Sequence, residues 1–411
     1  MGARVRRRVA VTGLGVVAPI GVSVAAFRES LLAGRSGVGA ITRFDATGLP
    51  TRIAAEVRGV TTSGRDRKID FALEAARQAM DDATAGGTRP DGAGGVSLGV
   101  GLELFSMEDV AAARARDVAL PATRRERLTF LQSPSDLCVH AIARRYDLTT
   151  PPLIHVSACA AGTDAIGAAF RLVANGRRDF VLAGGTDSMI NPLGVAGFCR
   201  LGATSTANER PHAASRPFDR ARDGFVLGEG AGVLVLEPLD AALARGAAVH
   251  AEIVGYGNSF DAHGISEPHP EGRGAWQAMA RALAEAGVGP DVIDCVNAHG
   301  TSTPKNDPIE TAAIKRLLGP RAALVPVCAT KSMIGHLISA AGAVEAIAAI
   351  LGMRGGWVHP TLNLDTPDPA CDLDYVPHKA RAHRQRYVLS NSFGFGGQNA
   401  ALLLRAFNAG R

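Results

Sequence analysis

Short apolar runs alternate with helix-length stretches along almost the whole chain. The runs are continuous and show little polar alternation, which is typical of strands buried on both faces. The predicted strands are 9–15, 95–102, 153–158, 180–185, 230–239, 250–257, 292–300 and 324–330. The predicted helices include 23–33, 69–83 and 160–175. This alternation predicts an α/β protein with mostly parallel sheets covered on both faces.

Two helix-length stretches are similar to each other. AAGTDAIGAAF begins at Ala160 and AAGAVEAIAAI begins at Ala340, and each follows a strand and a loop with reactive side chains. An internal duplication would explain this, with two halves meeting near residues 248–255, but so would the packing of two unrelated buried helices. The segment 216–230 is polar and glycine-rich, and we expect it to be a long surface loop.

Composition and charge exclude several other classes of protein. The chain has 411 residues, of which 46% are hydrophobic and 20% charged, so it can bury a large core. The net charge is +5, but no basic run is interleaved with aromatic residues, so no nucleic acid partner is expected. No apolar run approaches the roughly 20 residues of a membrane span, and the basic start lacks the features of a signal peptide. We therefore expect a cytoplasmic protein without membrane contact.

Six scattered cysteines are the candidates for metal ligands, disulfides or nucleophiles. They are Cys138, Cys159, Cys199, Cys295, Cys328 and Cys371. There is no C-x-x-C pair, and no histidine stands at zinc-ligand spacing from two cysteines. Neither a metal site nor a disulfide framework is therefore expected, and most of the six are predicted to be small buried hydrophobic residues.

A glycine pattern near the N-terminus matches a nucleotide-binding loop only loosely. Gly13, Gly15 and Ala18 fit G-x-G-x-x-A after a strand. However, Pro19 and Gly21 interrupt the helix whose N-terminus would bind the phosphate. A turn that ends the strand explains the pattern better than a nucleotide site does.

Cys159 differs from the other cysteines in its surroundings. VSACAAGTDAIG places it between an apolar strand and a helix rich in alanine and glycine. Free backbone N–H groups and the helix dipole favour the thiolate there, and small neighbours would admit a substrate. A packed structural thiol would fit the same pattern, so Cys159 alone leaves both interpretations open.

Two later segments place ionisable side chains directly after predicted strands. VNAHGTSTPKND has His299 followed by three hydroxyl residues, and ATKSMIGHLISAAGAVE contains Lys331, His336 and Glu345. Catalytic loops in α/β proteins lie beyond the carboxyl ends of strands. A lone histidine is usually structural, but these surroundings offer few packing reasons for one.

A glycine-rich loop near the C-terminus completes the set. SNSFGFGGQNA alternates Phe393 and Phe395 with glycines, and its backbone N–H groups could bind an oxyanion. A plain turn before a last strand would fit as well. The combination of cysteine, two histidines, lysine and glycine loop predicts acyl transfer to a thiolate, with two imidazoles handling charge on a second substrate.

At this point the chain resembles a known family, the elongating β-ketoacyl-acyl-carrier-protein synthases, which include type II polyketide ketosynthases. The likeness runs in order from about Val9 to Ala406. It is carried by SACAAG, NAHGTSTPKNDPIE, TKSMIGHLISAAGAVE, CDLDYVPHKAR, SNSFGFGGQN, GLGVVAPIG, NPLGVAGF and RPFDRARDGFVLGEGAGVLVLE. The resemblance implies the thiolase-like fold, with two duplicated halves in a five-layered α-β-α-β-α arrangement, normally dimeric. It divides the chain into 1–249, with the nucleophile, and 250–411, with the histidines, lysine and oxyanion loop.

The resemblance also implies a role for each reactive side chain. Cys159 would accept the acyl chain from acyl carrier protein. His299 and His336 would bind the malonyl thioester carbonyl and stabilise the enolate formed on decarboxylation. Lys331 would order the site and hydrogen-bond near the second histidine, supported by Glu345.

Further residues would complete the site by the same resemblance. The backbone N–H groups of the nucleophile and Phe395 would form the oxyanion hole, and Phe395 with Phe393 would gate the acyl pocket. Thr301 and Thr303 would hydrogen-bond the pantetheine arm, and Asp307 would support the loop. No metal and no cofactor are expected, because the substrates are carried on the phosphopantetheine of acyl carrier protein.

Carrier docking and acyl-chain choice are the parts of the resemblance for which other interpretations stay open. Arg65, Arg67 and Lys68 stand where relatives meet the acidic carrier protein, although a solvated helix start would look the same. At 101–104 and 130–136 the chain replaces apolar or glycine-rich family segments of the acyl pocket with polar ones. These departures favour a specialised polyketide ketosynthase over housekeeping fatty-acid elongation. They leave open a homodimer or a heterodimer with a related subunit.

Two other members of the fold superfamily are disfavoured by the same residues. A thiolase would carry a second cysteine in the C-terminal glycine loop, which here reads SFGFGG. A chain-length-setting partner subunit typically lacks the nucleophile, whereas Cys159, His299 and His336 are all present.

Overall fold

The computed structural model describes residues 6–62, 66–101 and 134–407. Ten strands form one mixed sheet: β1 (Val9–Val17), β4 (Gly94–Val100), β5 (Leu153–His155), β6 (Phe180–Ser188), β7 (Glu229–Pro238), β8 (Ala251–Phe260), β9 (Cys295–Asn297), β10 (Val327–Cys328), β13 (Tyr387–Gly394) and β14 (Gln398–Arg405). Two small sheets pair β2 (Val38–Ala40) with β3 (Ile53–Ala55) and β11 (Trp357–Val358) with β12 (Arg381–Ala382).

The large sheet consists of two copies of one five-strand arrangement. The first copy has the order β5-β4-β6-β7-β1 and the second β10-β9-β13-β14-β8. In each copy the first three strands are parallel and the last two join antiparallel. Strands β1 and β8 pair antiparallel and connect the copies. The duplication suspected from two similar helices is therefore present in the strand order, while the division at 249/250 stays a prediction.

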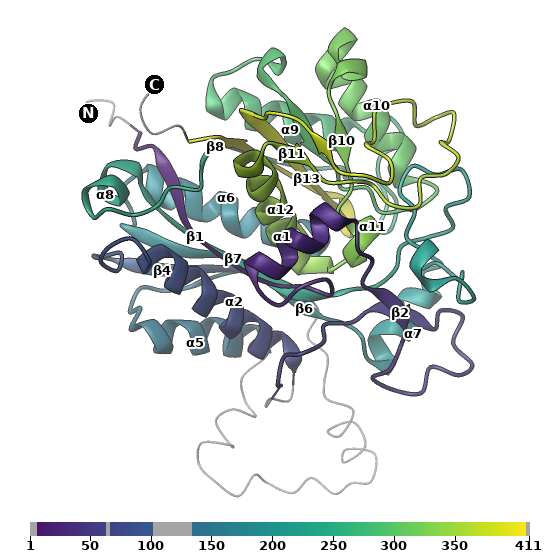
Figure 1. Cartoon of the computed structure of the whole chain (residues 1–411), viewed down its shortest axis with the longest axis horizontal. Helices are drawn as coiled ribbons and strands as arrows, with labels where there is room; N and C mark the ends of the chain where they lie inside the picture. The colour runs from purple at the N-terminus through teal and green to yellow at the C-terminus, as the bar shows by residue number, and fades with distance from the viewer. Residues whose placement is uncertain (1–5, 63–65, 102–133, 408–411) are drawn as a thin grey trace, which may run out of the picture.

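Helices cover the two half-sheets and fill the space between them. They are α1 (Val24–Ala33), α2 (Arg67–Thr84), α5 (Pro134–Tyr146), α6 (Ala161–Ala174), α7 (Pro192–Arg200), α8 (Leu239–Ala244), α9 (Arg273–Ala286), α10 (Asn306–Leu318), α11 (Lys331–Ile334) and α12 (Ala341–Gly355). Helices α2 and α5 lie outside the first half-sheet, α9 and α10 outside the second, and α6 and α12 between the two (Figure 1). This is the predicted five-layered arrangement.

Local capping explains where the first helices begin and end. The Ser23 hydroxyl accepts a hydrogen bond from the Ala26 N–H at the start of α1, and Gly34 ends that helix with a left-handed φ of 61°. The Asp66 carboxylate caps α2 by accepting from the Lys68 N–H. Both helices thus start close to the residues that the sequence predicted.

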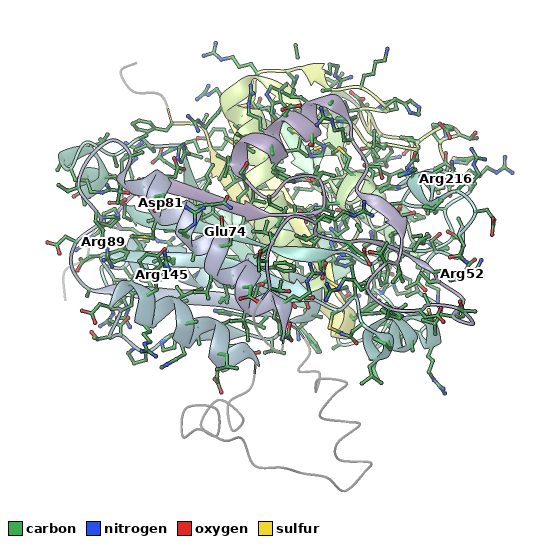
Figure 2. All side chains as sticks on the ribbon, turned by 60° about the horizontal axis from the view of Figure 1, so that its bottom comes forward. Arg52, Glu74, Asp81, Arg89, Arg145 and Arg216 are labelled. Atoms are coloured by element: carbon green, nitrogen blue, oxygen red, sulfur yellow. The ribbon has the colours of Figure 1, made fainter. Side chains whose placement is uncertain are left out.

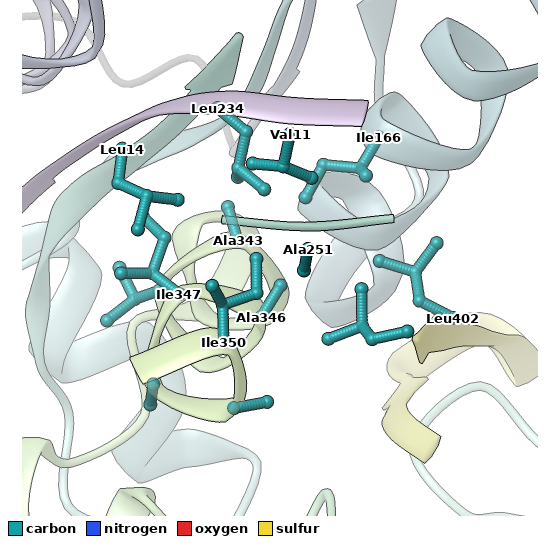
Figure 3. Packing of buried hydrophobic residues seen from close by; sticks show 14 of the residues in the cluster. Val11, Leu14, Ile166, Leu234, Ala251, Ala343, Ala346, Ile347, Ile350 and Leu402 are labelled. Atoms are coloured by element: carbon teal, nitrogen blue, oxygen red, sulfur yellow. The ribbon is translucent and has the colours of Figure 1, made fainter. Parts of the chain in front are cut away.

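Helix α12 is the centre of the core. Ala343, Ala346, Ile347 and Ile350 face side chains of β1, β7 and β14, as Figure 3 shows. The window Ile338–Gly355 is long and apolar enough to cross a membrane by composition, but 89% of it is buried inside the protein. Its apolar character is therefore explained by burial between two half-sheets.

Gly13 and Gly15 allow strand β1 and helix α2 to pack closely. A Cβ on Gly13 would lie 2.0 Å from the Ala79 carbonyl oxygen, and one on Gly15 would lie 1.9 Å from that of Ala75, both on α2. Both glycines lie inside β1. The predicted strand-ending turn is therefore wrong, and the pattern reflects the approach of α2 to the sheet.

Two other expectations about the fold are corrected. The sheet is mixed and not mostly parallel, because apolar runs buried on both faces look alike in either strand direction. The segment 216–230 is largely buried and not a surface loop, since Phe218 and Phe225 turn into the core.

Charged side chains gather on the outer helices and loops instead. The labelled examples in Figure 2 are Glu74, Asp81, Arg89, Arg145, Arg52 and Arg216. On α2, Arg77 pairs with both Glu74 and Asp81 at 2.6 Å. Such exposed pairs contribute little to stability, so the fold depends on its apolar layers.

Candidate active site

The nucleophile candidate lies on a tight turn between β5 and α6. Ala158 has a positive φ of 48°, and Cys159 follows within a 3₁₀ turn, Ala158–Ala160, that leads directly into the helix. The Cys159 side chain is buried, with 2% exposure. Gly394 lies against this turn, since a Cβ there would come within 3.0 Å of the Cys159 nitrogen. The end of β13 and the nucleophile turn are therefore in direct contact.

His299 is positioned by a carboxylate that binds its backbone. It follows β9, and its N–H donates to Glu310 Oε1 at 2.8 Å while the Gly300 N–H donates to Oε2 at 2.8 Å. The Asn391 amide donates to the same carboxylate at 3.1 Å. Glu310 comes from α10 and Asn391 from β13, so two elements fix the turn that carries the imidazole.

His336 is held through both its backbone and its ring. Its N–H donates to the Val226 carbonyl at 2.7 Å, and its Nδ1 accepts from the Ile338 N–H at 3.1 Å. The Phe225 ring packs against the imidazole at 5.3 Å. These contacts leave Nε2 as the free ring atom, and it is buried without a hydrogen-bond partner in the described chain.

The three reactive groups converge on one buried point. A ligand atom of each of Cys159, His299 and His336 lies within 4.8 Å of the others. The two imidazole rings are 5.3 Å apart and nearly perpendicular, at 82°. Residues that are far apart in the chain are thus brought together where the carboxyl ends of strands from both halves meet.

Lys331 fixes the tautomer of the first imidazole. Its ammonium lies 3.2 Å from His299 Nδ1, 2.6 Å from the His299 carbonyl oxygen and 2.6 Å from Glu345 Oε1. An ammonium can only donate, so Nδ1 accepts and the ring proton lies on Nε2. The predicted contact near the second histidine is therefore corrected, because the lysine binds the first, while the predicted support by Glu345 is present.

Both imidazoles are neutral hydrogen-bond donors. Burial, reinforced by the nearby Lys331 charge, holds the pKa of His299 and of His336 well below the usual value of 6.5. Each Nδ1 accepts a hydrogen bond, so each Nε2 carries the proton. Two N–H donors therefore face the point where the thiol lies.

The thiol of Cys159 is not the ready thiolate that the helix start suggested. Burial raises its pKa to about 11, against the opposing effects of the Phe395 backbone N–H and the Lys331 charge. Burial in the dry cavity therefore changes the pKa of Cys159 more than the helix N-terminus does. At neutral pH the group rests as a thiol.

One cavity connects this point to the surface. Phe393, Phe395, Thr301 and Thr303 all line it, together with the three reactive side chains. The two threonine hydroxyls lie 2.9 Å apart. Phe393 packs against the His299 ring at 5.8 Å. The gating role of the phenylalanines and the arm-binding role of the threonines stay predictions.

Asp307 lies behind the threonines and not in the cavity wall. Its carboxylate accepts from the Phe218 N–H at 2.8 Å and from the Thr301 hydroxyl at 3.4 Å. Arg222 lies 3.7 Å away. The supporting role of Asp307 stays a prediction.

The predicted carrier-docking residues are not free on the surface. Lys68 is 1% exposed and lies 3.3 Å from Asp66, and the Arg67 guanidinium hydrogen-bonds Glu229 and the Val57 carbonyl. A direct docking role for this pair is therefore wrong, since both side chains turn inward at the start of α2. Arg65 lies outside the described residues. So do residues 102–104 and 130–133, which make up most of the two segments where polar residues replace the family's acyl-pocket pattern.

Two site residues were missed by the sequence argument. Glu310 binds the His299 turn, and Phe225 packs on His336. An acid three positions after Asp307, in a helix that follows the histidine loop, was an available signal for Glu310. Phe225 was hidden by the interpretation of 216–230 as a surface loop.

The cysteine and two histidines could also ligate a soft metal ion, because they offer one sulfur and two nitrogens within reach of one another. Among the described residues these three form the one such group of metal-binding side chains. That the site holds no metal stays a prediction.

Residues 6–242 match the family described as beta-ketoacyl synthase, N-terminal domain, and residues 250–365 match beta-ketoacyl synthase, C-terminal domain. Together with the thiolase-like fold and the cysteine–histidine site, this shows that the chain belongs to the β-ketoacyl synthase family. It is an acyltransferase of the elongating 3-oxoacyl-acyl-carrier-protein synthase class.

Relatives from two kinds of pathway are similar along almost their full length. A 3-oxoacyl-[acyl-carrier-protein] synthase 2 of Coxiella burnetii is 43% identical, covering 97% of this chain and 98% of the relative. A putative polyketide beta-ketoacyl synthase 1 of Streptomyces cyaneus is 44% identical, with the same coverage.

Solved structures show the same fold. A type II polyketide ketosynthase, bound to a hexaketide and in complex with its acyl carrier protein, has a TM-score of 0.89 and 34% identity. The ishigamide ketosynthase/chain length factor has a TM-score of 0.85 and 36% identity. Both comparisons cover 98% of this chain and 100% of the other.

Proposed function

We propose that the protein catalyses the decarboxylative condensation of an enzyme-bound acyl group with malonyl-acyl carrier protein in a type II polyketide or related pathway. The observation that carries the proposal is the convergence of the Cys159 thiol and two neutral imidazole N–H donors on one buried point. Cys159 forms the carbon–sulfur bond, and the histidines stabilise the charge that decarboxylation creates.

In the first half-reaction Cys159 takes the acyl group from the carrier. The sulfur attacks the thioester carbonyl, the carbonyl–sulfur bond to the carrier breaks, and the thiol proton leaves with the carrier's pantetheine sulfur. The resting pKa of about 11 means that this proton must be removed during the transfer. The N–H groups of Cys159 and Phe395 stabilise the oxyanion, and losing one such donor typically costs about 3–4 kcal/mol.

In the second half-reaction malonyl thioester binds with its carbonyl oxygen toward His299 and His336. The bond to its carboxylate breaks, carbon dioxide leaves, and the electron pair forms an enolate whose oxygen accepts hydrogen bonds from both Nε2–H groups. The enolate carbon then attacks the acyl carbonyl on Cys159. The thiolate leaves and takes up a proton from water. No cofactor enters either step of the proposed reaction.

Sequence similarity supports both pathway assignments, since relatives named for fatty-acid-type synthases and for polyketide synthases are about equally identical. The polar departures in the sequence favour a polyketide or related pathway. Housekeeping fatty-acid elongation is the alternative. A non-elongating partner subunit is the weaker alternative, because the nucleophile and both histidines are present.

The proposed partners are an acyl carrier protein and a ketosynthase-like subunit in the cytoplasm. Strand β5 pairs only with β4 in the described chain and leaves its other edge open. Leu153, Ile154 and Val156 are exposed there by 37%, 36% and 71%. An open, apolar edge strand suits pairing with a second subunit.

The test is reconstitution with carrier-bound substrates. We expect β-ketoacyl-carrier product and carbon dioxide from acyl- and malonyl-carrier protein, with mass spectrometry locating the acyl intermediate. Preferential loading of unsaturated or oxygenated chains supports the polyketide pathway, whereas preferential loading of saturated medium and long chains supports fatty-acid elongation. Absence of condensation with every carrier substrate, with or without a co-expressed homologous subunit, would refute the proposal.

A further inference from the structure

An ion pair spans the mouth of the active-site cavity. The loop after β8 contributes Ser266 and Glu267 to the cavity wall, and the loop after β9 contributes Thr303 and Lys305. The Lys305 ammonium hydrogen-bonds the Glu267 carboxylate between these two loops. Both side chains are more than half exposed, so the pair lies at the entrance and not in the buried interior.

Lys305 differs in charge from the other described residues that line this cavity. Among the described residues that line it, Lys305 is the one lysine or arginine, while Asp261 and Glu267 are both acidic. The two histidines deeper in the cavity are neutral because their pKa values are lowered. Among the described lining residues, an anionic part of a substrate that enters here meets one positively charged side chain, and that side chain is paired with Glu267.

The Lys305–Glu267 pair can be exchanged at low cost. Exposed ion pairs contribute only about 0–1 kcal/mol, since water and salt screen them. A phosphate diester is also an anion, and it accepts charge-assisted hydrogen bonds from an ammonium as an exposed carboxylate does. A phosphate arriving at the mouth can therefore take the ammonium from Glu267.

We propose that Lys305 receives the phosphate of the phosphopantetheine-borne substrate and that Glu267 holds Lys305 ready in the free enzyme. The inference rests on the proposed function and adds a recognition residue to it. A phosphodiester is too strongly hydrated to enter the buried site, so it stays at the mouth while the uncharged arm passes Thr303 and Thr301 toward Cys159. Lys305 thus positions the substrate and takes no part in bond making.

The test compares loading of Cys159 from acyl-phosphopantetheine and from acyl-pantetheine, which differ only in the phosphate. We expect Lys305→Gln to lower the ratio of the two loading efficiencies about three- to fivefold, because an exposed charge pair is worth up to about 1 kcal/mol. Glu267→Gln removes the competing carboxylate and should raise the same ratio. Acyl-carrier protein, as a third substrate, should follow the phosphopantetheine thioester.

Lys315→Gln is the matched control, because Lys315 also forms an exposed pair, with Asp372, and neither residue lines the cavity. It should leave the ratio unchanged. A ratio for Lys305→Gln equal to that of the control would overturn the inference. Failure of the wild type to load from either thioester would instead refute the proposed function, so the two failures are distinguishable.

Discussion

The Cys159 sulfur lies where a helix start and a dry cavity act on it in opposite directions. The backbone N–H groups around the turn favour the anion, as the sequence suggested. Burial disfavours it more strongly, and the pKa rises to about 11. The resting enzyme therefore holds Cys159 as a neutral thiol. The sulfur becomes negative only as its proton is transferred during acyl loading.

This state predicts the pH dependence of Cys159 alkylation. Below its pKa a group is mostly protonated, so the thiolate fraction should rise about tenfold per pH unit from pH 6 to 9. We expect the rate of iodoacetamide labelling to rise in parallel, without a plateau, when the Cys159 peptide is followed by mass spectrometry. The half-exposed Cys199 serves as the internal reference. A plateau at Cys159 with a midpoint below pH 8 would contradict the account.

At the scale of elements, the nucleophile turn exists twice. Ala158 before Cys159 and Ile338 before Ser339 both have positive φ values, 48° and 45°, and each turn leads into a central helix. The second turn has a serine where the first has the nucleophile, and the Ser339 hydroxyl donates to the Ala158 carbonyl at 3.3 Å. The duplicated turn thus supports the catalytic one.

The contact between β13 and this turn predicts an effect of Gly394→Ala. The backbone of Gly394 has a φ of −113°, which any residue adopts. The effect of the substitution therefore depends only on whether the new Cβ fits. The new Cβ would lie 3.0 Å from the Cys159 nitrogen and 3.2 Å from the Ser157 oxygen. We expect acyl loading to fall at least about tenfold and the free energy of unfolding to fall by about 1–3 kcal/mol.

Gly197→Ala is the control for this substitution. Gly197 lies inside α7, and a Cβ there would meet nothing within 4 Å. Alanine should therefore leave loading unchanged and stabilise the helix by up to about 1 kcal/mol. Equal loading by the two variants, measured alongside thermal unfolding, would show that the β13 contact does not position the nucleophile.

The elements could be predicted from sequence more fully than their arrangement. Apolar runs located most strands, and Ser23 and Gly34 mark the ends of α1. Strand direction was mispredicted, because burial on both faces removes the alternation that would distinguish the cases. The inward turn of Arg67 was missed because its ion-pair partner, Glu229, is distant in the chain.

In the site, too, the positions of the reactive residues could be predicted from the sequence, but their individual contacts could not. Cys159 and His299 follow strands closely, and His336 lies in the segment after β10, so their convergence could be predicted from the sequence and the family resemblance. Which histidine Lys331 binds could not be, because it depends on side-chain geometry at the junction of the two halves. Glu310 was missed although its position after the histidine loop was an available signal, because the bonds from its carboxylate to the His299 and Gly300 N–H groups depend on the folded structure.

At the scale of the whole molecule, the proposed association with a second subunit can be tested at the edge of β5 that is unpaired among the described residues. Val156→Asp places a charge on a 71% exposed apolar residue beside this edge and should shift a dimer toward monomer. Light scattering coupled to size-exclusion chromatography measures the change. Leu324→Asp, at a 78% exposed position outside this edge, is the control and should leave the mass unchanged. Equal masses for both variants would exclude β5 from the interface.

The central claim is that one thiol and two imidazoles from the two halves of the molecule divide the chemistry between them. Malonyl-carrier protein decarboxylation by Cys159→Ala tests it most directly, with acyl loading followed in the same samples. The account predicts that this variant loads no acyl group but still releases carbon dioxide, whereas Cys159→Ala combined with His336→Ala loses most of that release. Condensation by Cys159→Ala at the wild-type rate, or undiminished decarboxylation after loss of His336, would contradict it.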